Sequence, residues 1–153
     1  MLNIAQRHSC HRGEIKISYL EWQLTNKLDL EPVLLLHGLA DCAVVWSSLG
    51  DYLSSRYHVV ALDLRGHGES SKPNDGYSSA EIIADLEALM AHLGWEKANI
   101  LGHSWGGKVA AIWATQNPEC FSSLVLGNHW VFLVNPEEFN REVAEFLDRQ
   151  ISK

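Results

Sequence analysis

Short apolar runs alternate with amphipathic helical segments along most of this chain. The runs are rich in Val, Ile and Leu and are bounded by Gly, Pro, Asn or Asp, which is typical of strands covered on both faces. Strands that alternate with helices indicate an α/β fold, a mostly parallel sheet flanked by helices. The expected strands are Glu14–Gln23, Pro32–Leu36, His58–Leu62, Ala98–Leu101 and Ser123–Leu126.

Helical spacing and capping residues define the segments between these strands. Ser78 and Glu81 form a capping box ahead of a helix that ends at Gly94. Pro136 stands at the first position of a final helix. Two further helices are expected at Val44–Leu53 and Gly106–Gln116, and the final helix should bury Phe139, Val143, Phe146 and Leu147.

Length and composition fit one soluble domain over residues 1–153, with a mobile end over residues 1–13. Apolar residues make up 46% of the 153 residues and charged residues 20%. The formal net charge of −7 argues against nucleic-acid or anionic-membrane partners, and no apolar run is long enough to span a bilayer. Three widely spaced cysteines favour reduced thiols in the cytoplasm. His8, Cys10 and His11 lack the further ligands that a metal site needs, so neither a metal nor a cofactor is predicted.

A G-x-S-x-G motif lies between an expected strand and an expected helix. Gly102, His103, Ser104, Trp105 and Gly106 form this motif. In that context it predicts a nucleophile elbow, a sharp turn that exposes the serine hydroxyl. A side chain at either flanking glycine would collide with the neighbouring elements, and the Trp105 N–H would lie at a helix N-terminus, facing an oxyanion. A chance serine in a tight turn is the alternative.

Several motifs together resemble the α/β-hydrolase superfamily. His37-Gly38 resembles its oxyanion loop, in which the N–H of Leu39 would be the second donor. Residues 63–70, DLRGHGES, resemble its D-x-R-G-x-G-x-S loop. Residues 128–147 resemble the region of its catalytic histidine and last helix. The resemblance implies that His37, Gly38, Gly102, His103 and Gly106 shape the site.

Part of the pattern of this superfamily is missing. Relatives usually carry a lid and two further strands after the strand that matches Ser123–Leu126, and the first of these strands ends in the acid of the triad. Here that strand continues directly into the region of His129. Glu119 precedes the strand and should lie at the opposite end of the sheet, and Asp63 is structural by resemblance. The resemblance therefore implies a shortened member of this superfamily, with no evident triad acid and an open site.

His129 is the candidate general base for Ser104. A loop that leaves the neighbouring strand could reach the serine, because adjacent strands lie about 4.8 Å apart. Asn128 could in principle orient the imidazole, although sequence neighbours rarely achieve that geometry. The alternative is a histidine that has been left beside a deletion and makes no catalytic contact.

These residues predict an acyl-transfer reaction. Ser104 would attack a carbonyl carbon, His129 would take the proton, and Leu39 and Trp105 would hold the oxyanion. By resemblance, a serine argues against epoxide hydrolases, which use a carboxylate at this place. The expected function is weak hydrolysis of short-chain or activated carboxylic esters, and the alternative is a non-catalytic, ligand-binding remnant.

Loss of two strands would leave Ser123–Leu126 at the edge of the sheet. Exposed apolar edges pair with other chains. We therefore expect a possible homodimer through this strand, unless Trp130–Val134 covers it.

Overall fold

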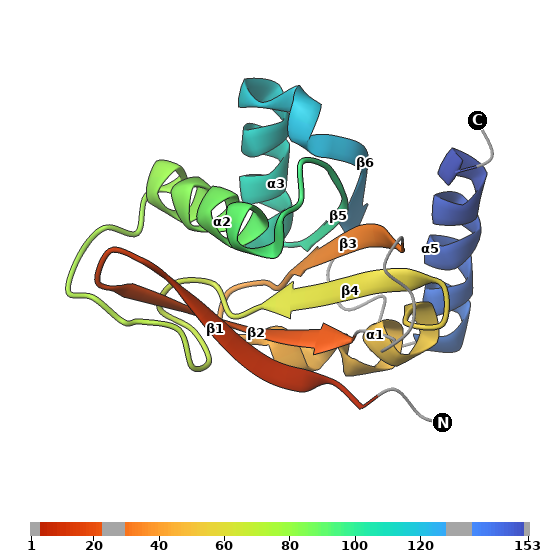
Figure 1. The fold of residues 1–153 in the computed structure, drawn as a ribbon, viewed down its shortest axis with the longest axis horizontal. Helices are drawn as coiled ribbons and strands as arrows, with labels where there is room; N and C mark the ends of the chain where they lie inside the picture. Colours follow the sequence, from red (N-terminus) through yellow and green to blue (C-terminus); the bar gives the residue numbers. More distant parts are fainter. Residues whose placement is uncertain (1–3, 23–29, 128–135, 152–153) are drawn as a thin grey trace.

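A six-stranded sheet forms the centre of the computed structural model, which describes residues 4–22, 30–127 and 136–151. Helices cover both faces of the sheet (Figure 1), as the α/β prediction requires. The strands are β1 (Gln6–Arg12), β2 (Ile15–Trp22), β3 (Glu31–Leu36), β4 (Tyr57–Leu62), β5 (Ala98–His103) and β6 (Phe121–Gly127). The helices are α1 (Ser47–Leu53), α2 (Ser79–Leu93), α3 (Trp105–Gln116) and α5 (Pro136–Ile151), with short 3₁₀ helices η1 (Ala43–Trp46) and η2 (Pro118–Cys120).

The strand order places a topological switch point at the centre of the sheet. The order is β1-β2-β4-β3-β5-β6. Strands β4, β3, β5 and β6 run parallel to one another, β2 pairs antiparallel with β4, and β1 pairs antiparallel with β2. After β3 the chain moves to one side to form β4, and then crosses back to form β5 on the other side of β3. Such a reversal opens a binding crevice at the carboxyl ends of the two central strands. The loop after β3 and the turn after β5 meet there.

Alternate residues of the central strands face two separate cores. Leu34 and Leu36 of β3 pack with α2 and α3, whereas Val33 and Leu35 pack with α1 and α5. All four are buried, with at most 1% of their surface exposed. This burial on both faces explains why these strands read as continuous apolar runs in the sequence.

The helix ends follow the expected capping chemistry. The Ser78 side chain accepts a hydrogen bond from the N–H of Glu81 at the start of α2. Gly94 ends the same helix in the left-handed conformation, with φ of 72°. The predicted helix at Val44–Leu53 is divided between η1 and α1. Asn140 of α5 is buried and donates to the backbone carbonyl and the hydroxyl of Ser48, which ties α5 to α1.

The expectation of a mobile end over residues 1–13 is wrong for β1. Gln6–Arg12 pairs antiparallel with β2 along its whole length, and Cys10 is buried against Ile17. This strand lacks the apolar pattern of a buried strand, because one of its faces is exposed and it is an edge strand with charged side chains. The sequence therefore did not indicate a strand here.

β6 and α5 differ from the prediction in how deeply they are buried. Among the described residues β6 pairs only with β5, so it is the second edge of the sheet. Leu126 is 56% exposed. Phe139 and Phe146 of α5, which were expected to be buried, are only partly buried, whereas Val143 and Leu147 are buried.

Candidate active site

Ser104 occupies a strained turn between β5 and α3. Its φ of 50° and ψ of −114° lie in a region that residues with a side chain rarely adopt. Within the described residues only one other non-glycine residue has a positive φ, Ala40 at 59°. Ala40 lies in the loop after β3, so the two strained residues are at the carboxyl ends of adjacent strands. Such strain is typical of functional sites.

The glycines around Ser104 are required by space. A Cβ atom on Gly102 would lie 2.6 Å from the Cα of Gly107, and one on Gly106 would lie 2.5 Å from the carbonyl oxygen of Leu36. Both distances are too short for any side chain. The N–H of Gly106 donates to the carbonyl of His37 at 3.1 Å, so α3 begins in contact with the end of β3. The elbow geometry that the motif predicted is present.

The loop after β3 lies against the serine. A Cβ atom on Gly38 would lie 3.2 Å from the Cβ of Ser104 and 3.0 Å from Nδ1 of His103. A residue larger than glycine would therefore require the loop or the side chains of His103 and Ser104 to move by a few tenths of an ångström. Leu39 follows in the same loop with an exposed side chain, and Trp105 is the first residue of α3. The structure thus brings the predicted oxyanion residues to the two segments that flank Ser104.

His37 holds the end of β3 to the end of β4. Its ring is fully buried, and Nε2 accepts a hydrogen bond from the N–H of Leu64 at 2.9 Å. Nδ1 lies 2.7 Å from the carbonyl oxygen of Gly38, so it carries the proton and donates. Burial lowers the pKa of His37 below its usual value, which keeps the ring neutral. His37 therefore shapes the site and does not act as a base.

His67 holds the same loop from the other side. Its Nε2 accepts from the N–H of Ala40 at 3.3 Å, and its Nδ1 lies 3.1 Å from the carbonyl of Arg65. The rings of His37 and His67 meet edge to face, with centroids 5.1 Å apart. The two imidazoles together fix the backbone that precedes and follows Leu39.

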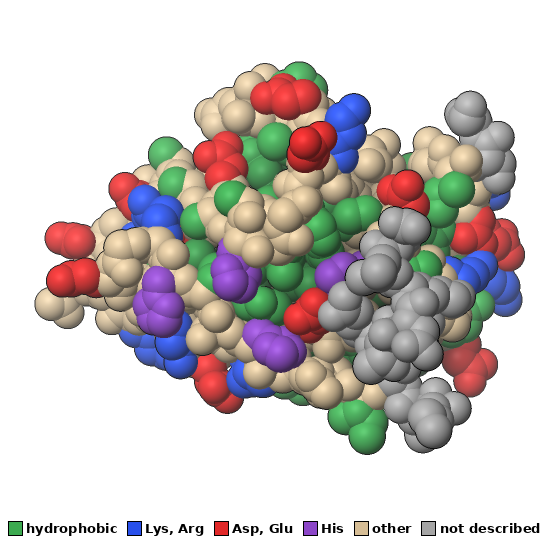
Figure 2. Space-filling view, viewed as in Figure 1, with side chains coloured by type: hydrophobic (Ala, Val, Ile, Leu, Met, Phe, Trp, Pro, Cys, Tyr) green, Lys and Arg blue, Asp and Glu red, His purple; other side chains and the backbone are tan. Residues whose placement is uncertain are grey.

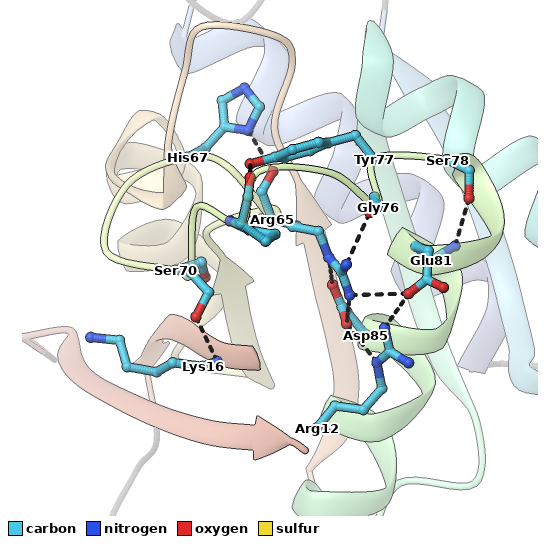
Figure 3. A network of polar contacts seen from close by, with 12 residues as sticks. Arg12, Lys16, Arg65, His67, Ser70, Gly76, Tyr77, Ser78, Glu81 and Asp85 are labelled. Atoms are coloured by element: carbon cyan, nitrogen blue, oxygen red, sulfur yellow. Dashed lines mark hydrogen bonds and ion pairs between the residues drawn. The ribbon is translucent and has the colours of Figure 1, made fainter. Parts of the chain in front are cut away.

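A buried ion pair anchors the segment that carries His67 (Figure 3). The guanidinium of Arg65 forms two 2.8 Å bonds to the carboxylate of Asp85 in α2, and it also donates to the carbonyl of Gly76. Arg12 of β1 donates to Asp85 and to Glu81. Strand β1, helix α2 and the loop after β4 are thereby joined in one network.

Asp63, at the carboxyl end of β4, is structural. Its two oxygens accept from the N–H groups of Ala43 and Glu69 and from the guanidinium of Arg7. Burial alone would raise its pKa, but these donors lower it below its usual value. The carboxylate is fully committed to these bonds and is not free to orient an imidazole.

Glu119 is excluded as a partner of the site by its position. It lies in η2, which leads into the amino end of β6, whereas Ser104 follows the carboxyl end of the parallel strand β5. The sequence predicted this placement. His129 and Asn128 lie outside the described residues, as do Trp130–Val134.

Histidine side chains are visible at several places on the face shown in Figure 2. Apart from the active-site loops, two histidines share one carboxylate. Nε2 of His58, near the start of β4, donates to the carboxylate of Glu21 of β2 at 2.6 Å, and His8 of β1 lies 3.5 Å from the same carboxylate. This cluster joins three strands near the amino end of β4, whereas Ser104 lies at the carboxyl ends of the parallel strands. We did not predict the cluster from the sequence, because residues 1–13 were expected to be mobile. Among residues 4–22, 30–127 and 136–151, no group of three such side chains has the arrangement of a metal site.

Comparison with known proteins gives the family. Residues 31–151 match the sequence model of the alpha/beta hydrolase fold family, which covers both loops of the site and the elbow. The chain belongs to this family. Among the relatives of this chain is the soluble epoxide hydrolase of Corynebacterium sp. (strain C12). It is 36% identical to this chain over 95 residues, which are 62% of this chain and 33% of that protein. A serine hydrolase-like protein of Danio rerio is 38% identical over 104 residues, 67% of this chain and 32% of that protein.

Solved structures agree with the sequence comparison. A structure described as a membrane phospholipase A, a novel bacterial virulence factor, superposes with a TM-score of 0.75 and 34% identity over 82% of this α/β-hydrolase chain and 40% of that chain. The chain spans about a third of the length of the curated relatives named above. No helix in the described part of the chain is long and apolar enough to cross a membrane.

Proposed function

We propose that this α/β-hydrolase hydrolyses short-chain or activated carboxylic esters through an acyl-enzyme on Ser104. The observation that carries the proposal is the backbone of Ser104 itself. Ser104 has φ of 50° at the start of α3 and lies against the Gly38 loop, which is the backbone geometry by which a nucleophile elbow exposes its hydroxyl.

The proposed reaction has two halves. The Ser104 hydroxyl attacks the ester carbonyl carbon and gives its proton to His129, and the oxyanion accepts hydrogen bonds from the N–H groups of Leu39 and Trp105. The intermediate collapses to an acyl-enzyme, and the departing alkoxide takes the proton from His129 as it leaves as an alcohol. Water then attacks the acyl carbon by the same route and releases the acid and the serine hydroxyl.

An ester fits a serine better than an epoxide does. Attack of a serine oxygen on an epoxide carbon would leave an ether, which has no carbonyl for water to attack, so the enzyme would not turn over. A carboxylate nucleophile would instead leave an ester. The hydroxyl of Ser104 therefore favours ester hydrolysis, although several relatives are named epoxide hydrolases.

We expect the activity to be weak. Asp63 is committed to three donors and Glu119 precedes β6 at the other end of the sheet from Ser104, so neither is placed to serve as the acid of a triad with Ser104. Loss of the acid from a serine protease lowers kcat by about 10⁴-fold. Esters with good leaving groups need less help from a general acid, so p-nitrophenyl acetate is the substrate of choice.

The first experiment compares wild type with Ser104→Ala on p-nitrophenyl acetate. A rate that falls to the level of buffer in the variant supports the proposal. Equal rates would instead favour a non-catalytic remnant that binds a ligand. Wild type should also leave a racemic aryl epoxide unchanged, and conversion of the epoxide that survives Ser104→Ala would exclude an acyl-enzyme mechanism.

The second experiment tests the roles of the two residues separately. A fluorophosphonate should label Ser104, with the modified peptide identified by mass spectrometry, and His129→Ala should slow labelling by about 10²-fold or more. Unchanged labelling of His129→Ala would rule out His129 as the base while leaving Ser104 as the nucleophile.

A further inference from the structure

An apolar groove of about 450 Å³ runs between β6 and α5. Its apolar lining comes from Leu124, Val125 and Leu126 of the strand and from Phe139 and Phe146 of the helix. Both elements lie on the same side of the molecule (Figure 1). The helical wall of the groove contributes none of the residues around Ser104, whereas the strand wall ends beside the elbow, where Leu126 pairs with Gly102.

The strand wall of the groove is an unusually apolar edge. Residues 124–126 are Leu-Val-Leu, and Leu126 is 56% exposed. β5, the neighbour of β6, is buried throughout. Natural edge strands usually carry charges, bulges or prolines that prevent pairing. Within the described residues, β6 has a strand neighbour on one side only.

The opposite edge of the same sheet is protected in the usual way. β1 carries Arg7, His8, His11 and Arg12, and the guanidinium groups are engaged with Asp63 and Asp85. The contrast between the two edges indicates that the β6 edge favours pairing with another strand, whereas the charged β1 edge prevents such pairing.

Charges along α5 point to the identity of the partner. The groove is lined at one position by Glu142 and at another by Arg149, seven residues apart, which is about 10 Å along a helix. Phe146 lies between them. A second copy that is rotated by a two-fold axis near Phe146 would place its Arg149 beside Glu142 of the first copy, and the reverse. The charge pattern is therefore complementary to itself in an antiparallel arrangement.

We propose that the groove between β6 and α5 binds a second copy of this chain, in a two-fold symmetric homodimer. The β6 edges pair antiparallel, the Phe146 rings meet near the axis, and Glu142 pairs with Arg149 of the partner. This arrangement would cover Leu126 and join the two sheets into one continuous sheet.

Oligomeric state tests the proposal directly. We expect sedimentation velocity of the 153-residue chain to show a discrete dimer at concentrations up to about 100 μM. Leu126→Asp should yield a folded monomer at the same concentrations, since Leu126 is already half exposed and its substitution costs little folding energy. Far-UV circular dichroism checks that the variant is folded.

A charge exchange tests the symmetry. Glu142→Arg and Arg149→Glu should each weaken the dimer by about tenfold or more, because like charges then meet across the axis. The double variant E142R/R149E should recover to within about threefold of wild type, because both pairs are restored in the opposite sense. Lys97→Glu is the matched control: it makes the same change of charge as Arg149→Glu at an exposed residue that does not line the groove, and it should leave the dimer unchanged.

Four outcomes would overturn the proposal. A monomer at every concentration would mean that another part of a chain, Trp130–Val134 included, or a different partner occupies the groove. Aggregates without a discrete dimer would mean that the edge is merely unprotected. A dimer that survives Leu126→Asp, or a charge exchange that fails to recover, would place the interface elsewhere.

Discussion

The backbone N–H of Ala40 donates to Nε2 of His67 across 3.3 Å, which ties the loop after β3 to the loop after β4. Ala40 is one of two non-glycine residues with positive φ in the described part of the chain, and it follows the proposed oxyanion donor Leu39. The hydrogen bond therefore helps to hold a strained backbone beside Ser104. His67 is a positioning residue in this arrangement, because it acts through Ala40.

Replacement of His67 by alanine should lower kcat for p-nitrophenyl acetate by about tenfold, which corresponds to the loss of one hydrogen bond. KM should change little, because the oxyanion exists only in the transition state. His67→Gln keeps an acceptor and should recover part of the loss. His11→Ala, on the exposed face of β1, is the control. Equal losses in kcat for His67→Gln and His67→Ala would contradict the positioning role.

The Arg65–Asp85 pair should dominate the stability of the loop region. Both side chains are nearly buried, at 4% and 3% exposed, and they share two hydrogen bonds. Asp85→Asn removes the carboxylate that makes two hydrogen bonds to the buried guanidinium and leaves only the 3.3 Å contact with the half-exposed Glu81, so it should lower the free energy of unfolding by about 3 kcal/mol in urea denaturation. The exposed pair of Arg141 and Glu142 provides the control, since Arg141→Ala should cost less than about 1 kcal/mol. Similar losses for the two variants would contradict the importance of burial.

Alanine substitutions at Gly106 and Gly94 distinguish the energetic cost of a steric clash from the cost of backbone strain. A Cβ on Gly106 would lie 2.5 Å and 2.6 Å from the carbonyl oxygens of Leu36 and His37, so Gly106→Ala should destabilise the fold by more than about 2 kcal/mol. Gly94 has open space around it but a φ of 72°, so Gly94→Ala should cost about 1 kcal/mol. Thermal unfolding measures both. A milder effect at position 106 than at position 94 would mean that the elbow can move away from β3.

The parts of this chain that sequence predicts well are those in which local chemistry and burial agree. Leu34 and Leu36 face one core while Val33 and Leu35 face the other, so a continuous apolar run could only be an inner strand. The nucleophile elbow is equally predictable from sequence. Gly102 and Gly106 both stand where a Cβ atom would collide with neighbouring backbone atoms.

Features that depend on distant pairing were not predictable in the same way. β1 carries arginines and histidines, yet it pairs with β2 along its length, and its Arg7 and Arg12 side chains bond to Asp63 and Asp85. Residues 63 and 85 are far along the chain, so no local pattern could predict these contacts. The cluster of His8, Glu21 and His58 was missed for the same reason.

His37 should make stability depend on pH. Burial lowers its pKa in the folded state below the unfolded value of about 6.5, so the unfolded chain binds this proton more readily. The contribution of the neutral His37 ring to the free energy of unfolding is therefore complete above the unfolded pKa and is lost as the pH falls below it. His37→Gln keeps an acceptor for the Leu64 N–H but does not titrate, so its free energy of unfolding should fall less than that of wild type between pH 7.5 and 5.5. A steeper fall in the variant would contradict the neutral, buried ring.

The strain at Ser104 should be measurable as a trade between stability and activity. Alanine at this position keeps a side chain in a backbone with φ of 50°, whereas glycine adopts that region freely. Ser104→Gly should therefore be more stable than Ser104→Ala by about 1 kcal/mol in urea denaturation, even though glycine loses more backbone entropy on folding. Both variants should lack acyl-enzyme formation. If the alanine variant were the more stable of the two, the turn would carry no strain, and the exposed hydroxyl would need another explanation.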